Sequence, residues 1–224
     1  MADVSRDGRR AVLWRMANRS DDDLYLLDLA TGAEARLTPH EGPGSFGGGR
    51  FAPDGGTVYL SSDAGRELVA FARVALDVGG RPGPIEVLAA REDAELQGFA
   101  LTEDGAEAAL VWNVAGRSEL AFYDPRTGRT EPGPDLPAEL AAGLTYSRDG
   151  RRLAFVASGA AAPADVWVLD RPGGRLTRVT RSPHPGVDLA DLVRPAPVRF
   201  PAHDGLELSG WLYRPPAGPR AGGR

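Results

Sequence analysis

Cysteine does not occur in this chain of 224 residues, so it has no disulfide, no thiolate nucleophile and no cysteine-ligated metal. Histidine is scarce as well, with His40, His184 and His203 the only three. None of them has the H-x-x-x-H or H-E-x-x-H spacing of a zinc site. The sequence therefore predicts no metal-binding residue.

Long apolar runs are also missing. No stretch approaches the roughly 18 apolar residues that a membrane-spanning helix needs. The first twenty residues are mostly polar and contain no apolar core of the length found in secretory signals. We therefore expect a cytoplasmic location and no membrane partner.

Lysine is absent, and all 26 basic residues are arginines scattered along the chain. The formal net charge is −5, which argues against a nucleic-acid-binding surface. Abundant Ala, Gly, Pro and Arg together favour a GC-rich coding sequence over an arginine-based binding surface. We expect no nucleic-acid partner.

What the chain does contain is a short phrase that occurs four times. An apolar residue stands three places before an Asp-Gly step, and an apolar run follows. The four copies are Val4-Ser5-Arg6-Asp7-Gly8, Phe51-Ala52-Pro53-Asp54-Gly55, Leu101-Thr102-Glu103-Asp104-Gly105 and Tyr146-Ser147-Arg148-Asp149-Gly150. The Asp-Gly steps lie 47, 50 and 45 residues apart, a period typical of propellers and solenoids.

The second copy shows how one repeat is expected to fold. A short strand at residues 50–52 reaches Pro53-Asp54-Gly55, where Pro presets φ, Asp bonds the local backbone and Gly accepts a positive φ. Residues 57–60 (TVYL) then form the return strand. Two further strands follow in each repeat, and four antiparallel strands in about 45 residues make one propeller blade. We predict an all-β fold: a partial β-propeller of about four four-stranded blades.

The repeat stops after Thr180. We expect blades over residues 1–181, a linker over 182–197 and a hairpin over 198–224. The hairpin is read from an apolar strand, the Asp-Gly turn at Asp204, and a second strand with alternating apolar residues.

The quoted segments resemble a known family. The four repeats are similar to the TolB-like blades of the prolyl oligopeptidase family of serine peptidases. The phrase VRFPAHDGLELSGWLYRPPAG, which starts at Val198, looks like that family's passage into its α/β-hydrolase domain. The segments LDLATGAEARLT (residues 27–38) and LTRVTRSPHPGVDLADLVRP (residues 176–195) are closest to the acylaminoacyl-peptidase-like branch.

This resemblance implies a full-length enzyme that hydrolyses short peptides with a Ser-Asp-His triad and no cofactor, while the propeller restricts substrate access. The family's G-x-S-x-G nucleophile motif has no counterpart here. Ser45 comes nearest, but Pro43 replaces the first glycine. We therefore expect a truncated fragment with no catalytic residue, inactive alone, with peptides as partners only in the full-length enzyme.

Other candidate sites are each weaker than a structural alternative. Gly42 to Gly47 matches G-x-G-x-x-G, but a strand and turn follow where a dinucleotide site needs a helix, so we favour an inter-blade loop and no cofactor. Asp21-Asp22-Asp23 lacks the alternating ligands of a calcium loop and fits a solvated loop. His203, Asp204 and Ser209 share one hairpin, which spacing alone does not make a triad. Asp188 and Asp191 are expected to be surface groups.

A second hypothesis is a stand-alone TolB-like propeller that serves as a protein-interaction scaffold, since propellers with about four blades are known. The exit hairpin speaks against it, because a binding propeller has no evident need for one. Substrate specificity, the blade number of a complete propeller and the oligomeric state stay open.

Overall fold

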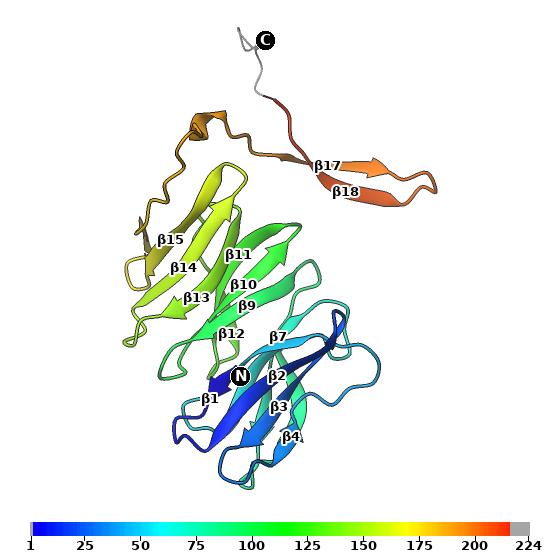
Figure 1. Cartoon of the computed structure of the whole chain (residues 1–224), viewed down its shortest axis with the longest axis vertical. Coiled ribbons are helices and arrows are strands. Elements are labelled where there is room, and N and C mark those ends of the chain that lie inside the picture. The colour runs from blue at the N-terminus through cyan, green and yellow to red at the C-terminus, as the bar shows by residue number, and fades with distance from the viewer. Residues whose placement is uncertain (1, 216–224) are drawn as a thin grey trace.

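The computed structural model describes residues 2–215 and contains four sheets, each of four antiparallel strands in sequential order (Figure 1). The first blade consists of β1 (Asp3–Val4), β2 (Arg10–Asn18), β3 (Asp21–Asp28) and β4 (Glu34–Arg36). The second consists of β5 (Phe46–Phe51), β6 (Thr57–Ser62), β7 (Ala70–Leu76) and β8 (Pro82–Ala89). The third consists of β9 (Glu95–Leu101), β10 (Ala108–Val114), β11 (Arg117–Asp124) and β12 (Arg129–Pro132). The fourth consists of β13 (Leu140–Tyr146), β14 (Arg152–Gly159), β15 (Ala162–Asp170) and β16 (Arg175–Arg178).

In each blade the repeated phrase starts at the last residue of the first strand and forms the turn into the second strand. In the fourth blade, Ser147 Oγ donates to Asp149 at 2.6 Å, and the amide of Arg152 donates to Ser147 Oγ at 3.0 Å. Gly150 has φ of +68°, which a residue with a side chain rarely adopts. Ser5, Asp7 and Gly8 repeat this arrangement in the first blade. The phrase therefore recurs because a tight turn requires it.

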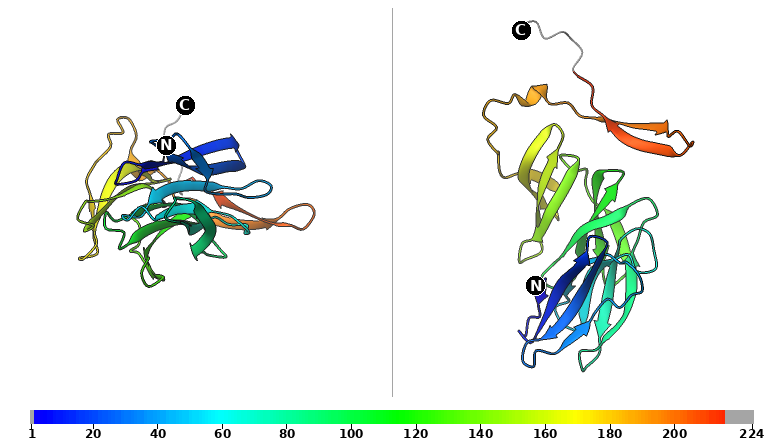
Figure 2. Two further views of the ribbon diagram at one scale, coloured as in Figure 1. Left: turned by 90° about the horizontal axis from the view of Figure 1, so that it is seen from below. Right: turned by 45° about the vertical axis from the view of Figure 1, so that its right-hand side comes forward.

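Apolar side chains fill three cores, one between each pair of neighbouring blades. Strand β10 contributes to two of them, because successive side chains point to opposite faces of a sheet. Leu110 and Trp112 pack toward the second blade, whereas Val111 packs toward the fourth. The four sheets fan around their first strands, as the view from below shows (Figure 2). The prediction of an all-β chain forming part of a propeller is confirmed.

Beyond the fourth blade, the chain leaves the propeller through a short 3-10 helix, η1 (Leu189–Asp191), and a separate hairpin (Figure 1). The hairpin pairs β17 (Ala196–Pro201) with β18 (Glu207–Leu212) in antiparallel register, with Phe200 opposite Leu208. Part of the predicted hairpin region, residues 216–224, lies outside the described residues. Over residues 2–215 the structure has no helix long and apolar enough to cross a membrane.

Candidate functional site

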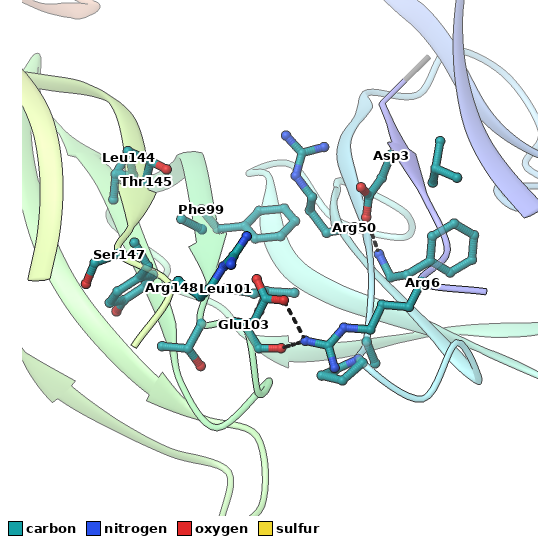
Figure 3. A pocket seen from close by; sticks show the side chains of 17 residues that line it. Asp3, Arg6, Arg50, Phe99, Leu101, Glu103, Leu144, Thr145, Ser147 and Arg148 are labelled. Atoms are coloured by element: carbon teal, nitrogen blue, oxygen red, sulfur yellow. Dashed lines mark hydrogen bonds and ion pairs between the residues drawn. The ribbon is translucent and has the colours of Figure 1, made fainter. Parts of the chain in front are cut away.

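The first strands of the four blades converge on a funnel of about 400 Å³ at their Asp-Gly ends (Figure 3). Each copy of the repeated phrase contributes to its wall in the same way. The apolar residues that open the phrase line the funnel, and they are Val4, Phe51, Leu101 and Tyr146. The residues directly before each aspartate also line it, and they are Arg6, Pro53, Glu103 and Arg148.

An ion pair crosses the funnel from the first blade to the third. Arg6 Nη2 lies 3.0 Å from Glu103 Oε1 and also donates to the backbone oxygen of Glu103 (Figure 3). Both side chains are more than half exposed. Water therefore screens the pair, and it adds little to stability. The pair places one charge of each sign on the funnel wall.

Two further arginines give the funnel positive charge. Arg50 Nη1 donates to the backbone oxygens of Ala2, at 2.5 Å, and Gly49, at 3.1 Å. Arg148 is exposed, and no hydrogen bond or ion pair joins its guanidinium to another residue of the described chain. Both guanidinium groups thus lie at the wall without a carboxylate partner among residues 2–215.

A partly buried network supports the wall formed by the fourth blade. The Tyr146 hydroxyl donates to Glu107 Oε1 at 2.6 Å. Burial is the larger cause, and this hydrogen bond the next, that raises the pKa of Tyr146. Arg171 forms a bidentate pair with the same carboxylate, at 2.8 and 2.6 Å. Its guanidinium carbon also lies 3.3 Å from the centre of the Phe122 ring. These contacts join the third and fourth blades beside the funnel.

The one serine of the funnel lining, Ser147, is hydrogen-bonded to a carboxylate of its own turn. No histidine is among the residues that line the funnel. The hydroxyl of Ser147 donates to Asp149 inside the turn and is therefore committed to local structure. The charged and polar lining suits a polar passage or a binding surface.

The predicted acidic cluster has a structural role in the first blade. Asp21 Oδ1 lies 3.0 Å from His40 Nε2, and Asp22 accepts the amide of Phe46 from the second blade. Asp23 accepts Arg36. Within residues 2–215, no group of three side chains is placed to hold a metal ion. The sequence predicted a solvated loop here, and this was wrong. The three aspartates are the first residues of β3, and their carboxylates accept hydrogen bonds from other residues of the chain.

The candidate triad on the hairpin does not assemble. His203 and Asp204 lie at the turn between β17 and β18, and Ser209 lies on β18 opposite Arg199. All three are exposed. Asp204 accepts the amide of Leu206, and no hydrogen bond joins it to His203 or Ser209 in the described chain.

The remaining candidates are loop and surface residues. The segment from Gly42 to Gly47 forms the connection from β4 into β5, so a strand follows where a dinucleotide site needs a helix. Ser45 is exposed in that loop. Asp188 caps η1 by accepting the amide of Ala190 at 2.9 Å, and both Asp188 and Asp191 are exposed as predicted.

The sequence analysis did not single out the funnel residues. The signal was present in the repeat itself, because equivalent positions in successive blades lie at equivalent places around a propeller axis. Aligning the four phrases on their aspartates brings Arg6, Glu103 and Arg148 into one column. That column is the ring of side chains found at the funnel wall.

No protein-family model matches the sequence, and no curated protein matches it at the significance required. Solved structures do match. A puromycin-hydrolyzing peptidase of Mycobacterium tuberculosis is 19% identical, with a TM-score of 0.74, over 93% of this chain and 33% of its own. Prolyl oligopeptidase B of Galerina marginata is 15% identical, with a TM-score of 0.69, over 93% of this chain and 30% of its own.

A third match is TolB of Acinetobacter baumannii, 19% identical with a TM-score of 0.60. It covers 79% of this chain and 42% of TolB. The solved structures that the chain resembles therefore include peptidases of the prolyl oligopeptidase family and a TolB propeller. At these identities the likeness establishes the fold. The chain spans about a third of the length of the peptidases that it matches.

Proposed function

We propose that this chain is the non-catalytic propeller portion of a serine peptidase of the prolyl oligopeptidase family. The full-length enzyme would hydrolyse short peptides, and the propeller would restrict which substrates reach the catalytic domain. The hairpin β17–β18 would be the start of that α/β-hydrolase domain. In this proposal the chain supplies positioning and exclusion, and the nucleophile, base and acid come from a domain that follows.

The exit hairpin is the observation that carries this proposal. The four blades lie within residues 3–178, and a match over 93% of 224 residues takes in about 208. The peptidase likeness therefore includes part of the exit segment. The TolB likeness covers 79% of the chain, which is the share that the blades alone would occupy. This difference favours a peptidase over a binding propeller.

Labelling with a fluorophosphonate probe tests the claim that the chain is inactive alone. The purified 224-residue chain is expected neither to label nor to hydrolyse peptide substrates, because no serine hydroxyl is hydrogen-bonded to a histidine in the described chain. An active serine hydrolase treated in parallel shows that the probe works. Labelling that disappears in Ser209→Ala would overturn the claim and place a nucleophile on the hairpin.

The DNA after the codon for Arg224 tests the origin of the chain. Read in its three frames, it is expected to encode a G-x-S-x-G motif followed by the aspartate and histidine of a triad. Its absence from all three frames would contradict the assignment to a peptidase, whatever the labelling result.

The TolB match supports one alternative, a stand-alone propeller that serves as a protein-interaction scaffold. Size-exclusion chromatography with light scattering, followed by urea unfolding, separates the two. A monodisperse monomer that unfolds cooperatively would favour the scaffold. An aggregating product would favour a portion of a larger protein, because uncovered blade faces and sheet edges promote association.

A further inference from the structure

A second cavity, of about 380 Å³, lies between the exit hairpin and the fourth blade. It includes Leu140 at the start of β13, whereas the funnel lies at the other end of the same strand. The hairpin side of the cavity carries Pro195, Trp211 and Tyr213. The blade side is made mostly of small residues from the end of β14 through the start of β15, including Ser158, Gly159, Ala160 and Ala162.

The hairpin is seated on the third blade by a specific fit. Gly116, in the turn between β10 and β11, has φ of +83°. A Cβ atom there would lie 2.9 Å from Trp211 Nε1, so a larger residue would push the indole away. The Arg117 guanidinium carbon lies 5.2 Å from the centre of the Trp211 ring. Trp211, which forms the aromatic wall of the cavity, therefore contacts the turn between β10 and β11.

One acidic side chain in this cavity is incompletely paired. Glu139 Oε1 lies 3.4 Å from Arg194 Nε. Glu139 Oε2 is buried and has no hydrogen-bond partner among the described residues. A Cβ atom at Gly159 would lie 1.7 Å from Oε2, so a larger residue there would force this carboxylate to shift. A buried carboxylate oxygen without a donor is costly, and a ligand that donates to it recovers that cost.

We propose that this cavity binds a primary ammonium group carried on a flat apolar body. The ammonium group would donate to Glu139 Oε2 and offset the negative charge, while the flat body would lie between Trp211 and the small residues of the fourth blade. The terminal torsion of a glutamate is broad, so a partial rotation brings the shielded oxygen to the cavity. A quaternary ammonium would not serve, because it has no N–H to donate.

Two sources carry this chemistry: the amino terminus of a peptide with an aromatic first residue, and a free arylalkyl amine. Only the assignment to a peptide rests on the proposed peptidase function. The ammonium site itself rests on the cavity, on Glu139 and on Trp211, so it stands or fails independently of any catalytic domain.

Calorimetric titration of the full chain with three probes tests the proposal. The probes are phenethylamine, phenylalanyl-glycinamide and its N-acetyl derivative. The two amines are expected to bind and the acetylated peptide is not, because acetylation removes the charge. Tighter binding of the free dipeptide assigns the site to peptide amino termini, whereas tighter binding of phenethylamine assigns it to free amines. Failure of both amines to bind, or equal binding of the acetylated probe, would overturn the proposal.

Variants locate the binding. Glu139→Gln keeps the shape of the side chain and is expected to weaken amine binding by about tenfold or more, as loss of a charged hydrogen bond predicts. Gly159→Ala keeps the charge but displaces the carboxylate, so a similar loss is expected. Glu131→Gln, at an exposed position on β12 outside the cavity, is the matched control. Unchanged affinity in Glu139→Gln would overturn the proposal.

A readout on the unaltered protein keeps the test independent of variant folding. The indole N–H of Trp211 gives a nuclear magnetic resonance signal of its own. Its chemical shift is expected to move on titration with the free amines and to stay in place with the acetylated probe. A shift confined to other tryptophans would place binding elsewhere and would contradict the proposal.

Discussion

Strands β10 and β14 occupy the same position in neighbouring blades, yet their burial differs. From Ala108 to Trp112, every side chain of β10 is at most 2% exposed. On β14, Leu153 and Phe155 point to one face and are equally buried. Val156 points to the opposite face and is 37% exposed. Both strands are nearly continuous in apolar residues. The difference therefore lies in what covers them.

A propeller blade therefore does not complete its own core. The third blade has a neighbour on each side, and its two middle strands contribute to two cores. In the described chain, the fourth blade has a neighbour on one side only, and so does the first. A strand that is apolar on both faces needs a neighbouring blade against each face. Each blade therefore depends on the next for part of its stability.

The largest effect is expected from Leu110→Ala, in the core between the second and third blades. Leu110 is fully buried, and removing its side chain leaves a cavity. We expect the free energy of unfolding to fall by about 2–5 kcal/mol. Leu29→Ala, at an exposed position after β3, is the control and should change it by less than about 0.5 kcal/mol. Urea unfolding measures both, and equal losses would show that the blade core is not as described.

A matched pair of valines tests the two faces directly. Val111→Ala on β10 removes a side chain that is 1% exposed, and the expected loss of unfolding free energy is about 2 kcal/mol. Val156→Ala on β14 is the same chemical change on an open face, with an expected loss of about 0.5 kcal/mol. A large loss for Val156→Ala would mean that another surface covers that face in solution, and light scattering would then reveal the association.

The sequence predicted the blades because their turns and strands follow local rules. The glycine of the Asp-Gly phrase adopts a positive φ, and the return strands are apolar and β-branched. Both features can be predicted from the sequence alone. The funnel was less legible, because the side chains that meet there, such as Arg6 and Glu103, lie 97 residues apart. The cavity at Glu139 could not be predicted from the sequence, because it depends on where the hairpin lies against the blades. The local sequence determines the strands and turns, whereas tertiary packing alone brings distant side chains together.

The first and fourth blades also share a polar clamp. In the first blade, the Asp23 carboxylate accepts hydrogen bonds from the Arg36 guanidinium and from the Thr38 hydroxyl. Thr38 Oγ1 lies 2.8 Å from Asp23 Oδ1. The Thr38 hydroxyl in turn accepts the amide of Leu24 at 3.0 Å. The clamp therefore ties the third strand of the blade to the residues after its fourth strand.

The fourth blade repeats this clamp residue for residue. Asp165 accepts Arg178 and the Thr180 hydroxyl, and Thr180 Oγ1 accepts the amide of Val166 at 2.8 Å. The amide of Ser182 adds a further bond to Asp165, at 2.8 Å. The clamps strengthen the two blades that have one covered face.

The acid sensitivity of the fourth-blade clamp can be measured. The hydrogen bond from Thr180, with those from Arg178 and Ser182, lowers the pKa of Asp165 from its ordinary 3.8 to about 2. A lowered pKa means that the stabilisation is present above the ordinary value and is lost as the pH falls through about 2. We expect Asp165→Asn to be less stable than the unaltered chain at neutral pH, with the gap closing as the pH falls through this range.

Urea unfolding over a series of acidic buffers measures this gap. Asp135→Asn, at an exposed position before β13, is the control and should show no such change with pH. A gap between Asp165→Asn and the unaltered chain that stays constant from neutral pH to about pH 2 would contradict an ionised clamp.

The smallest effect is expected from His40, which lies beside the first-blade clamp. Its Nδ1 lies 2.8 Å from the backbone oxygen of Thr38, and its Nε2 lies 3.0 Å from Asp21 Oδ1. Both oxygens accept and neither donates, so the protonated imidazole, which donates from both ring nitrogens, satisfies both contacts. Burial alone would lower the pKa of His40, but the bonds to Thr38 and Asp21, aided by Asp23, outweigh it and raise the pKa.

A raised pKa reverses the direction of the pH dependence. The stabilisation from His40 is complete below its ordinary pKa of 6.5 and is lost as the pH rises through the raised value. We expect His40→Asn to be less stable than the unaltered chain at about pH 6, with a gap that narrows as the pH rises through the raised pKa of His40. His203→Asn, at the exposed hairpin turn, is the matched control and should leave the pH profile unchanged. A gap for His40→Asn that widens as the pH rises would mean that the imidazole is neutral in the clamp, and the first blade would then lack the charged contact that the structure gives it.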